Sequence, residues 1–320
     1  MSRLFRDVDG GALFPHGSVV CIGAFDGLHL GHRALVRHAV ARARELSLPA
    51  VALSFEPLPR EFFSRDLPPP RLTLFRDKYQ GLCELGADGV GLLRFDAQLA
   101  AMSAEEFVRK VLAERLGARE VWIGPEFRFG NRRGGDLPLL QELGAELGFS
   151  AGEIEAVQLQ GERVSSTRIR EFLRSGDFTD AARLLGRAYS IGGRVVRGKQ
   201  LGRTLGFPTA NLRFPKTPAL SGIYATWVHG VADDSGRSGP RASVSSFGTR
   251  PTVDGVEPLL EAHLFDFDGD LYGRHIEVEF VAKLRDELKF PDLASLTEQM
   301  QRDAETARRL LSEQRLRATA

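Results

Sequence analysis

Three glycines and two histidines lie close together just after an apolar run near the start of the 320-residue chain. The run Val19–Gly23 is typical of a buried strand, and it leads into Gly23-Ala24-Phe25-Asp26-Gly27-Leu28-His29-Leu30-Gly31-His32. Glycines at 23, 27 and 31 let a phosphate approach the backbone, and a helix expected from about Gly31 turns its N-terminal amides and dipole toward an anion. The segment predicts a nucleotide site made of Gly23, Phe25, Asp26, His29, Gly31 and His32.

The two histidines are the candidate catalytic groups of this segment. His29 and His32 are three residues apart, so both can face the anion and stabilise charge that grows on a phosphate in the transition state. A metal pair is a weaker interpretation, because two histidines without a nearby third ligand make a poor zinc site. Histidines that serve only packing are disfavoured by the flanking glycines.

Hydroxyl side chains begin a second predicted helix, in the segment Ser165-Ser166-Thr167-Arg168-Ile169-Arg170. Ser166 and Thr167 can cap that helix, and together with Arg170 one turn later they can hold triphosphate oxygens. Hydroxyls before a helix are more often only a cap. Paired with the first segment, however, they resemble the signature of the nucleotidylyltransferase superfamily, a His-x-Gly-His turn with a Ser/Thr-x-x-Arg helix start. The chain has no Gly-x-x-x-x-Gly-Lys-Ser/Thr run, which argues against a P-loop enzyme.

Aromatic and basic residues follow two further predicted strands. Phe55, Pro57 and Phe62 come at or after the end of the strand 50–55, and Arg128 follows the strand 120–123. Ligands of open α/β sheets bind beyond the carboxyl ends of the strands, so these side chains are candidates for one pocket. An ordinary hydrophobic loop and a solvated arginine remain open as alternatives.

A glycine-rich basic loop marks the second half of the chain. It runs from Gly198 and Lys199 through Arg203 to Pro208-Thr209-Ala210-Asn211, inside a stretch, 187–232, that has seven basic residues and no acid. The Thr209 hydroxyl and the Asn211 carbonyl suit Mg²⁺, which prefers oxygen ligands and brings phosphate oxygens with it. A barrel corner built from glycine and proline is the plain alternative. Further on, Glu261 in an apolar strand is either a base or a paired structural acid.

The elements expected around these segments change in kind near residue 186. Before it, short apolar runs alternate with helical patterns, which predicts a parallel sheet covered on both faces. After it, strands with period-two alternation predict an antiparallel barrel or sandwich, with a hairpin at Asp268-Gly269 and a closing amphipathic helix over Ser295–Leu316. We therefore expect two domains, residues 1–186 and 187–320.

Composition limits the classes of protein that remain. Hydrophobic residues make up 42% and charged residues 27%, and 43 basic against 42 acidic residues give a net charge of +1. That balance disfavours a nucleic-acid-coating protein. Two cysteines argue against a disulfide scaffold, and no apolar stretch approaches the roughly 18 residues of a membrane span. We expect a cytoplasmic protein with no nucleic-acid or membrane partner.

The motifs together resemble the bacterial bifunctional riboflavin kinase/FAD synthetase family, in that family's order and over nearly the whole chain. Besides those above, they include Gly222-Ile223-Tyr224-Ala225, Gly248-Thr249-Arg250-Pro251-Thr252 and Phe265-Asp266-Phe267-Asp268-Gly269-Asp270-Leu271-Tyr272-Gly273. The resemblance implies a Rossmann-like α/β nucleotidylyltransferase domain, followed by a six-stranded flavokinase barrel. The first would transfer AMP from ATP to FMN, giving FAD and pyrophosphate, and the second would phosphorylate riboflavin to FMN.

The resemblance also implies roles for single residues. His29, His32, Ser166, Thr167 and Arg170 would contact the ATP triphosphate of the first site, and Phe55, Pro57, Phe62 and Arg128 its flavin. In the barrel, Gly198, Lys199, Arg203, Thr209 and Asn211 would bind ATP, the last two also Mg²⁺. Glu261 would be the base on the riboflavin hydroxyl, and Arg285 would help to cover the flavin.

Four places depart from the family pattern. Ala24 and Leu58 stand where asparagine and histidine are more usual, Pro125-Glu126 replaces a more usual acidic pair, and Ser245-Ser246 precedes Phe247-Gly248 where Ala-Asn before Ile-Gly is commoner. None of these changes removes a named catalytic group, but contacts at Glu126 and Ser246 come into question. Two alternatives stay open: another nucleotidylyltransferase with an accessory barrel, and a barrel that binds RNA. We expect a monomer or a weak homo-oligomer.

Overall fold

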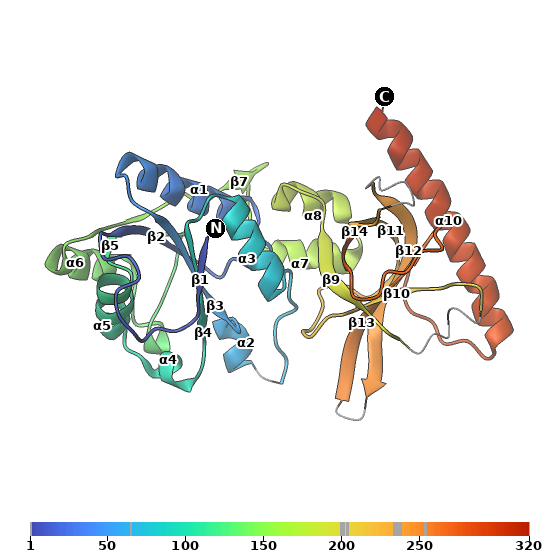
Figure 1. Ribbon diagram of the computed structural model, residues 1–320, viewed down its shortest axis with the longest axis horizontal. Helices are drawn as coiled ribbons and strands as arrows, with labels where there is room; N and C mark the ends of the chain where they lie inside the picture. The colour runs from blue at the N-terminus through green and yellow to red at the C-terminus, as the bar shows by residue number, and fades with distance from the viewer. Residues whose placement is uncertain are drawn as a thin grey trace. The chain divides into compact units, whose positions relative to one another are not determined.

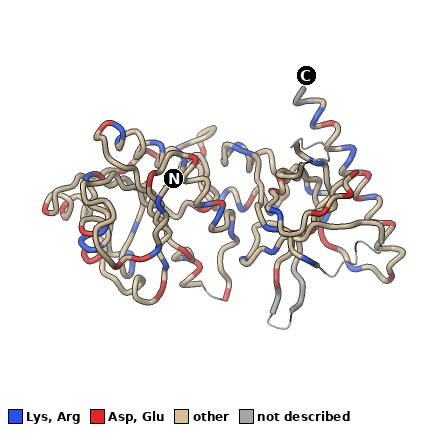
Figure 2. Tube along the Cα trace, in the orientation of Figure 1, with Lys and Arg blue, Asp and Glu red and all other residues tan. Residues whose placement is uncertain are grey.

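The computed structural model describes residues 2–64, 66–198, 202, 205–232, 239–252 and 255–319. By its packing the chain divides into two compact units, Met1–Pro69 with Thr73–Ser166, and Pro70–Leu72 with Thr167–Ala320 (Figure 1). Basic and acidic residues are interspersed along both units (Figure 2), as the near balance of 43 and 42 leads one to expect. Among the described residues, no helix combines the length and the apolar character that crossing a bilayer requires.

A six-stranded parallel sheet forms the centre of the first unit, which confirms the predicted α/β fold. Its strands are β1 (Arg3–Phe5), β2 (Ser18–Ile22), β3 (Ala50–Glu56), β4 (Gly89–Arg94), β5 (Ala118–Ile123) and β6 (Ser150–Glu153). They lie in the order β1-β4-β3-β2-β5-β6. The order in which successive strands join the sheet therefore reverses between β2 and β5. In sheets of this kind the ligand crevice lies at the carboxyl ends of the strands beside that switch.

Helices cover both faces of the sheet. They are α1 (Leu30–Glu45), α2 (Pro59–Phe63), α3 (Phe75–Glu84), α4 (Ala97–Ala101), α5 (Ala104–Glu106), η1 (Phe107–Arg115), η2 (Asn131–Arg133) and α6 (Leu137–Leu147); a small ribbon, β7 (Gln158–Leu159) and β8 (Glu162–Arg163), follows. Side chains of β2 alternate: Val19 and Cys21 pack with α1 and α3, while Val20 and Ile22 pack with η1 and α6. Because both faces are filled, chemistry is left to the strand ends.

The second unit is a closed antiparallel barrel, which confirms the barrel prediction. After α7 (Ser166–Ser175) and α8 (Phe178–Leu185) come β9 (Ser190–Val196), β10 (Ala210–Arg213), β11 (Gly222–His229), β12 (Arg241–Thr252), β13 (Gly255–Leu264) and β14 (His275–Arg285). Their order around the barrel is β10-β13-β12-β11-β14-β9. The predicted hairpin at Asp268-Gly269 is wrong, because β13 pairs with β10 and β12 and β14 pairs with β11 and β9.

The closing helix, α10 (Leu293–Thr319), packs along the outside of the barrel (Figure 1), as predicted from its amphipathic pattern. Ala307 and Leu311 are buried against Val244 and Phe265. The N-terminal turns of α10 therefore lie close to Arg285, the last residue of β14.

The two helices before the barrel belong to it by packing. Phe178 of α8 is buried, with its ring edge-on to Tyr224 at 5.8 Å and parallel to Phe280 at 5.9 Å. The short segment Pro70–Leu72 also packs with this unit, since Arg71 N donates to Thr217 O at 2.8 Å. Packing thus changes over near Ser166, whereas the division by function at residue 186 stays a prediction.

We expect a fragment of residues 167–320 to melt at a higher temperature than a fragment of residues 187–320, because only the longer one keeps α8 over the barrel rings. Phe178→Ala in the longer fragment should cost about 3–5 kcal/mol, the usual range for removing a buried phenylalanine. Thermal denaturation followed by circular dichroism measures both effects. Equal melting of the two fragments would show that α8 adds nothing to the barrel.

Candidate active sites

The turn between β2 and α1 is held in a tight left-handed path. Phe25, Gly27 and Leu28 have φ of 48°, 88° and 45°. Glycine is required at Gly23 by close packing, since a Cβ there would lie 2.9 Å from Phe25 Cε1. The predicted glycine-rich turn is therefore compact, and Ala24 is its exposed residue.

Asp26 fixes this turn through its side chain. The carboxylate is buried, and its Oδ1 accepts from Thr73 N at 3.0 Å and from Thr73 Oγ1 at 3.1 Å. Gly27 N donates to the same Thr73 hydroxyl at 2.9 Å, and Ser166 Oγ donates to Asp26 O at 2.9 Å. The two segments singled out in the sequence thus meet at Asp26, by way of the first residue of α7.

His29 and His32 lie against each other at the start of α1. Their rings stack with centroids 3.6 Å apart, and Phe25 meets His32 edge-on at 5.4 Å. His29 is the N-cap, and its Nδ1 accepts from His32 N at 3.3 Å. An accepting Nδ1 places the proton of the neutral ring on Nε2, so His29 keeps a donor for an anion at the helix N-terminus.

Thr167 and Arg170 lie in the second unit, in the first turns of α7. Arg170 Nε donates to Pro70 O at 2.6 Å, which ties α7 to the segment 70–72. Their contact with a triphosphate stays a prediction.

An aromatic cluster stands at the carboxyl ends of β3 and β4. Phe55 and Phe62 both meet Phe95 edge-on, at 5.8 and 5.4 Å, and Phe63 meets it at 5.9 Å. Phe63 is 68% exposed, so one edge of the cluster is open to a ligand. Pro57 lies in the turn between Phe55 and Phe62. Phe95 was missed from the sequence, although its place directly after β4 is the signal that could have found it.

The loop after β5 carries ion pairs of its own. Arg128 Nη1 lies 2.8 Å from Asp136 Oδ2, and Arg163 Nη1 lies 2.7 Å from Glu126 Oε2. Glu126, one of the departures from the family pattern, therefore has a protein partner. The predicted contact of Arg128 with flavin stays a prediction.

Backbone register brings the candidate residues of the barrel into one row. Asn211 on β10 is opposite Glu261 on β13, and Glu261 is opposite Ser246 on β12. Ser246 in turn is opposite Ile223 on β11, which is opposite Arg285 on β14. The predicted base, metal ligand and flavin-covering arginine thus lie on neighbouring strands at one level of the barrel.

Two cavities meet at Thr209. The first, about 260 Å³, is lined in part by Thr209, Asn211, Asp268, Asp270 and Tyr272. The loop predicted as a hairpin therefore walls a polar cavity instead. The second, about 250 Å³, is more apolar, and its described lining includes Gly202, Leu205, Phe207, Thr209, Ile223, Val244, Ser245, Ser246, Glu261, His263, Arg285, Leu296, Met300 and Asp303.

The donors around Thr209 suit a magnesium ion that arrives with nucleotide phosphates. Asn211 is buried, and its Oδ1 has no hydrogen-bond partner among the described residues. Its Nδ2 donates to Thr209 O at 3.1 Å, which turns Oδ1 away from the turn. Gly198 makes room for this amide, since a Cβ there would lie 2.7 Å from Oδ1. One or two oxygen ligands are what Mg²⁺ takes from a protein in such sites. Lys199 and Arg203 lie outside the described residues.

Three residues of α10 that line the second cavity were missed from the sequence: Leu296, Met300 and Asp303. Asp303 is buried, and its carboxylate pairs with Arg285 at 2.7 Å. A signal was present, because Asp303 falls at helical spacing between the apolar residues Met300 and Ala307 of α10. Among the described residues, no three histidine, cysteine or acidic side chains gather as a metal cluster.

Two titratable groups with shifted pKa values are His263, which lines the second cavity, and Glu287, which follows the lining residue Arg285 in the sequence. His263 Nδ1 lies 2.9 Å from Pro208 O, the residue before Thr209. Burial lowers the pKa of His263, and the contact with Pro208 opposes that shift. Glu287 lies two residues after Arg285. Burial is the main cause that raises the pKa of Glu287; the charge of Arg285 opposes this shift, and the charge of Glu261 adds to it.

We expect His263 to make the barrel less stable at acidic pH. A histidine whose folded pKa is lowered is neutral in the fold, so its stabilising contribution is complete above the unfolded value of about 6.5 and is lost as pH falls through the folded pKa. His263→Asn keeps a donor for Pro208 but does not titrate. Its melting temperature should therefore fall less than that of the unchanged protein between about pH 7.5 and about pH 5.5. If the melting temperatures of both proteins fall equally, His263 does not contribute to the pH dependence of stability.

Both units have counterparts among known proteins. The family model of FAD synthetase matches residues 12–168, and that of riboflavin kinase matches residues 185–311. A "bifunctional riboflavin kinase/FMN adenylyltransferase" of Escherichia coli (strain K12) is 43% identical over 309 residues, 96% of this chain and 97% of its own. The protein of the same description from Haemophilus influenzae is 39% identical over 307 residues, 96% of this chain and 98% of its own.

A solved structure extends the likeness to the fold. It is that of a protein from Streptococcus pneumoniae described as a macrolide-efflux protein, 28% identical, with a TM-score of 0.74 over 96% of this chain and 98% of the other. The matches cover both units with their site residues, and the chain belongs to the bifunctional riboflavin kinase/FMN adenylyltransferase family, with an FAD synthetase domain followed by a riboflavin kinase domain.

Proposed function

We propose that the protein makes FMN from riboflavin and ATP in its barrel, and FAD and pyrophosphate from FMN and ATP in its first unit. The observation that carries the kinase part is the row in which Asn211, Glu261 and Ser246 face one another across three strands. Two cavities that share Thr209 support it, because phosphoryl transfer needs a nucleotide and an acceptor to meet at one point.

In the kinase site, Glu261 accepts the proton of the terminal ribityl hydroxyl as its oxygen bonds to the γ-phosphorus and the bond to ADP breaks. Thr209 and Asn211 would hold Mg²⁺, which when bound neutralises phosphate charge. Arg285 and the apolar wall hold the flavin ring. Ser246, which replaces a more usual asparagine, is opposite Glu261 in the strand register and lines the same cavity.

In the adenylyltransferase site, the FMN phosphate attacks the α-phosphorus of ATP and pyrophosphate leaves. The nucleophile is already ionised, so alignment and charge neutralisation are the main tasks. His29 and His32 at the N-terminus of α1, together with Ser166 of the same unit, supply donors for the triphosphate. The aromatic cluster around Phe62 and Phe95 takes the flavin ring.

We place these reactions in the cytoplasm, in a monomer or a weak homo-oligomer. Cys21 and Cys83 are both free, which suits a reducing compartment. Burial raises the pKa of the Cys21 thiol to about 12, so it stays an inert core group.

The direct test of the proposed function is incubation of the protein with riboflavin, ATP and Mg²⁺, followed by chromatographic separation of riboflavin, FMN and FAD. Product that stops at FMN, or none at all, would overturn the proposal for one or both units.

Glu261→Gln is expected to abolish FMN formation, because glutamine keeps the size of the side chain but accepts no proton at neutral pH. Conversion of supplied FMN to FAD should persist. Glu257→Gln is the matched control, since Glu257 lies on the same strand with Arg213 as its partner at 3.5 Å. Near-normal kinase activity in Glu261→Gln would reduce Glu261 to a structural role.

His32→Ala or His29→Ala should lower FAD formation by roughly 10²-fold or more, the scale of losing one transition-state donor. Riboflavin phosphorylation should survive in both variants. His38→Ala is the control within α1, because that ring packs on Trp122 at 4.1 Å, away from the helix start. Equal loss of both activities in a folded variant would mean that the histidine site has been misassigned.

A further inference from the structure

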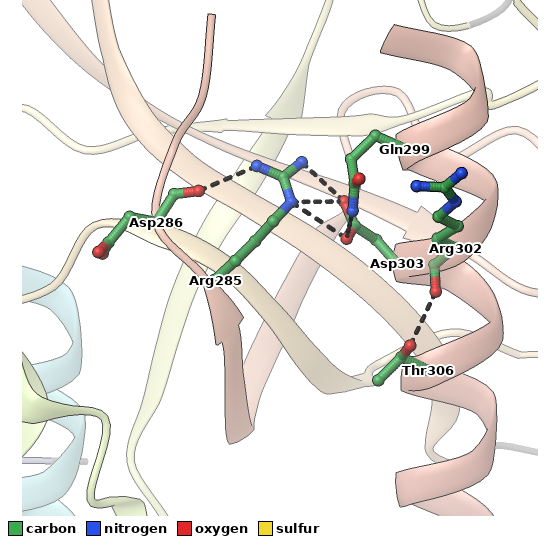
Figure 3. A network of polar contacts seen from close by, with 6 residues as sticks. All are labelled: Arg285, Asp286, Gln299, Arg302, Asp303 and Thr306. Carbon is green, nitrogen blue, oxygen red and sulfur yellow. Dashed lines mark hydrogen bonds and ion pairs between the residues drawn. The ribbon is translucent and has the colours of Figure 1, made fainter. Parts of the chain in front are cut away.

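The guanidinium of Arg285 is held along its edges by protein groups (Figure 3). Its Nε donates to both oxygens of Asp303, at 3.1 and 3.0 Å, and Nη2 donates to Asp303 Oδ2 at 2.7 Å. Its Nη1 donates to Asp286 O at 2.9 Å. This side-on fork fixes the plane of the guanidinium as well as its position.

The carboxylate that holds Arg285 is itself held. Gln299, one turn earlier on α10, donates from Nε2 to Asp303 Oδ1 at 2.9 Å (Figure 3). The side chains of Arg285 and Asp303 are only 17% and 8% exposed, and both line the second cavity. The pair is therefore a wall of the pocket proposed for flavin and lies in a medium of low dielectric constant.

Fastening α10 to the barrel does not require this pair. Arg308 of α10 already pairs with Asp266 at 2.8 Å, and its guanidinium lies 4.1 Å from the centroid of Phe265. Ala307 and Leu311 supply apolar packing nearby. A buried ion pair gains little net stability after desolvation, so its place in a cavity wall points to a role in the cavity.

The flat face of the guanidinium remains the part that can meet an aromatic ligand. Phe290 already packs near it, with Arg285 Cζ 5.7 Å from the ring centroid. A guanidinium held by hydrogen bonds from Nε, Nη1 and Nη2 keeps its flat face for stacking on an aromatic system such as an isoalloxazine. Ile223, Leu296 and Met300 complete an apolar wall around it.

We propose that Asp303, supported by Gln299, is a positioning residue of the riboflavin kinase reaction: it orients Arg285 so that the guanidinium face packs on the flavin ring. The proposal rests on the function proposed above for the barrel. It gives the last helix of the chain, through Asp303 and Gln299, a part in orienting the arginine of the flavin pocket.

Asp303→Asn tests the proposal, because asparagine keeps the size of the side chain but loses the charge and half of the fork. We expect the KM for riboflavin to rise about tenfold, with kcat and the KM for ATP changed less than about twofold. Asp266→Asn is the matched control, since it breaks the other ion pair between α10 and the barrel; its KM for riboflavin should stay unchanged. A rise in the KM for ATP equal to that for riboflavin would overturn the proposal.

A double-variant cycle separates positioning from a general structural effect. Arg285→Gln should raise the KM for riboflavin by itself, and adding Asp303→Asn to it should raise that KM no further, because the group being oriented is gone. Additive effects would overturn the proposal. If Asp303→Asn does not fold, Gln299→Met provides the same measurement with the carboxylate kept. A KM for riboflavin equal to that of the unchanged protein would then overturn the proposal.

Riboflavin binding without turnover keeps this proposal distinct from the proposed function. Fluorescence titration of riboflavin should show weaker binding to Asp303→Asn than to the unchanged protein and to Asp266→Asn. If the unchanged protein binds riboflavin but forms no FMN, the proposed kinase function fails while the role of Asp303 stands on the titration. If FMN forms normally and the titrations coincide, the role of Asp303 fails alone.

Discussion

Strand register is the constraint on which the barrel site depends. A phosphoryl transfer site needs a base, phosphate ligands and an acceptor pocket within a few ångströms of one another, and the residues proposed for these roles come from chain segments far apart in sequence. The pairing of β10 with β13 and of β13 with β12 sets Asn211, Glu261 and Ser246 in one row. A slip of one residue would turn every side chain of a strand to the other face, so the ladder of backbone hydrogen bonds protects the site as a whole.

The first unit meets a related need by different means. The glycines and histidines proposed for its ATP site come from one short turn, whose left-handed residues at Phe25, Gly27 and Leu28 compress the path between β2 and α1. Thr73 closes the turn by hydrogen bonds to Asp26 and Gly27. The N-terminal amides of the helix then offer charge compensation that needs no long-range register.

This difference decides how much the sequence predicts. Local features were readable: the glycine-rich turn, the alternation of strand and helix, the closing amphipathic helix and the Thr209–Asn211 turn all follow from short-range chemistry. Pairing between distant strands was not, and Asp268-Gly269 was therefore assigned to a hairpin when it walls a cavity. Asp303 was missed for the same reason, since its partner Arg285 lies 18 residues away on another element and only packing of α10 brings them together.

The two proposed sites also differ in how they use a carboxylate, because the nucleophile is a phosphate in one reaction and an alcohol in the other. Attack by a phosphate on ATP begins with an ionised oxygen, so the first site needs no base, and its one acid in the turn, Asp26, is buried in hydrogen bonds that shape the backbone. Attack by an alcohol must release a proton, and Glu261, the base in the proposed mechanism, lines the wall of the second cavity. A second acid, Asp303, stands in the same wall but is neutralised by Arg285. In the proposed mechanism the cavity thus holds two carboxylates with separate tasks: Asp303 is paired with Arg285, and Glu261 takes the proton.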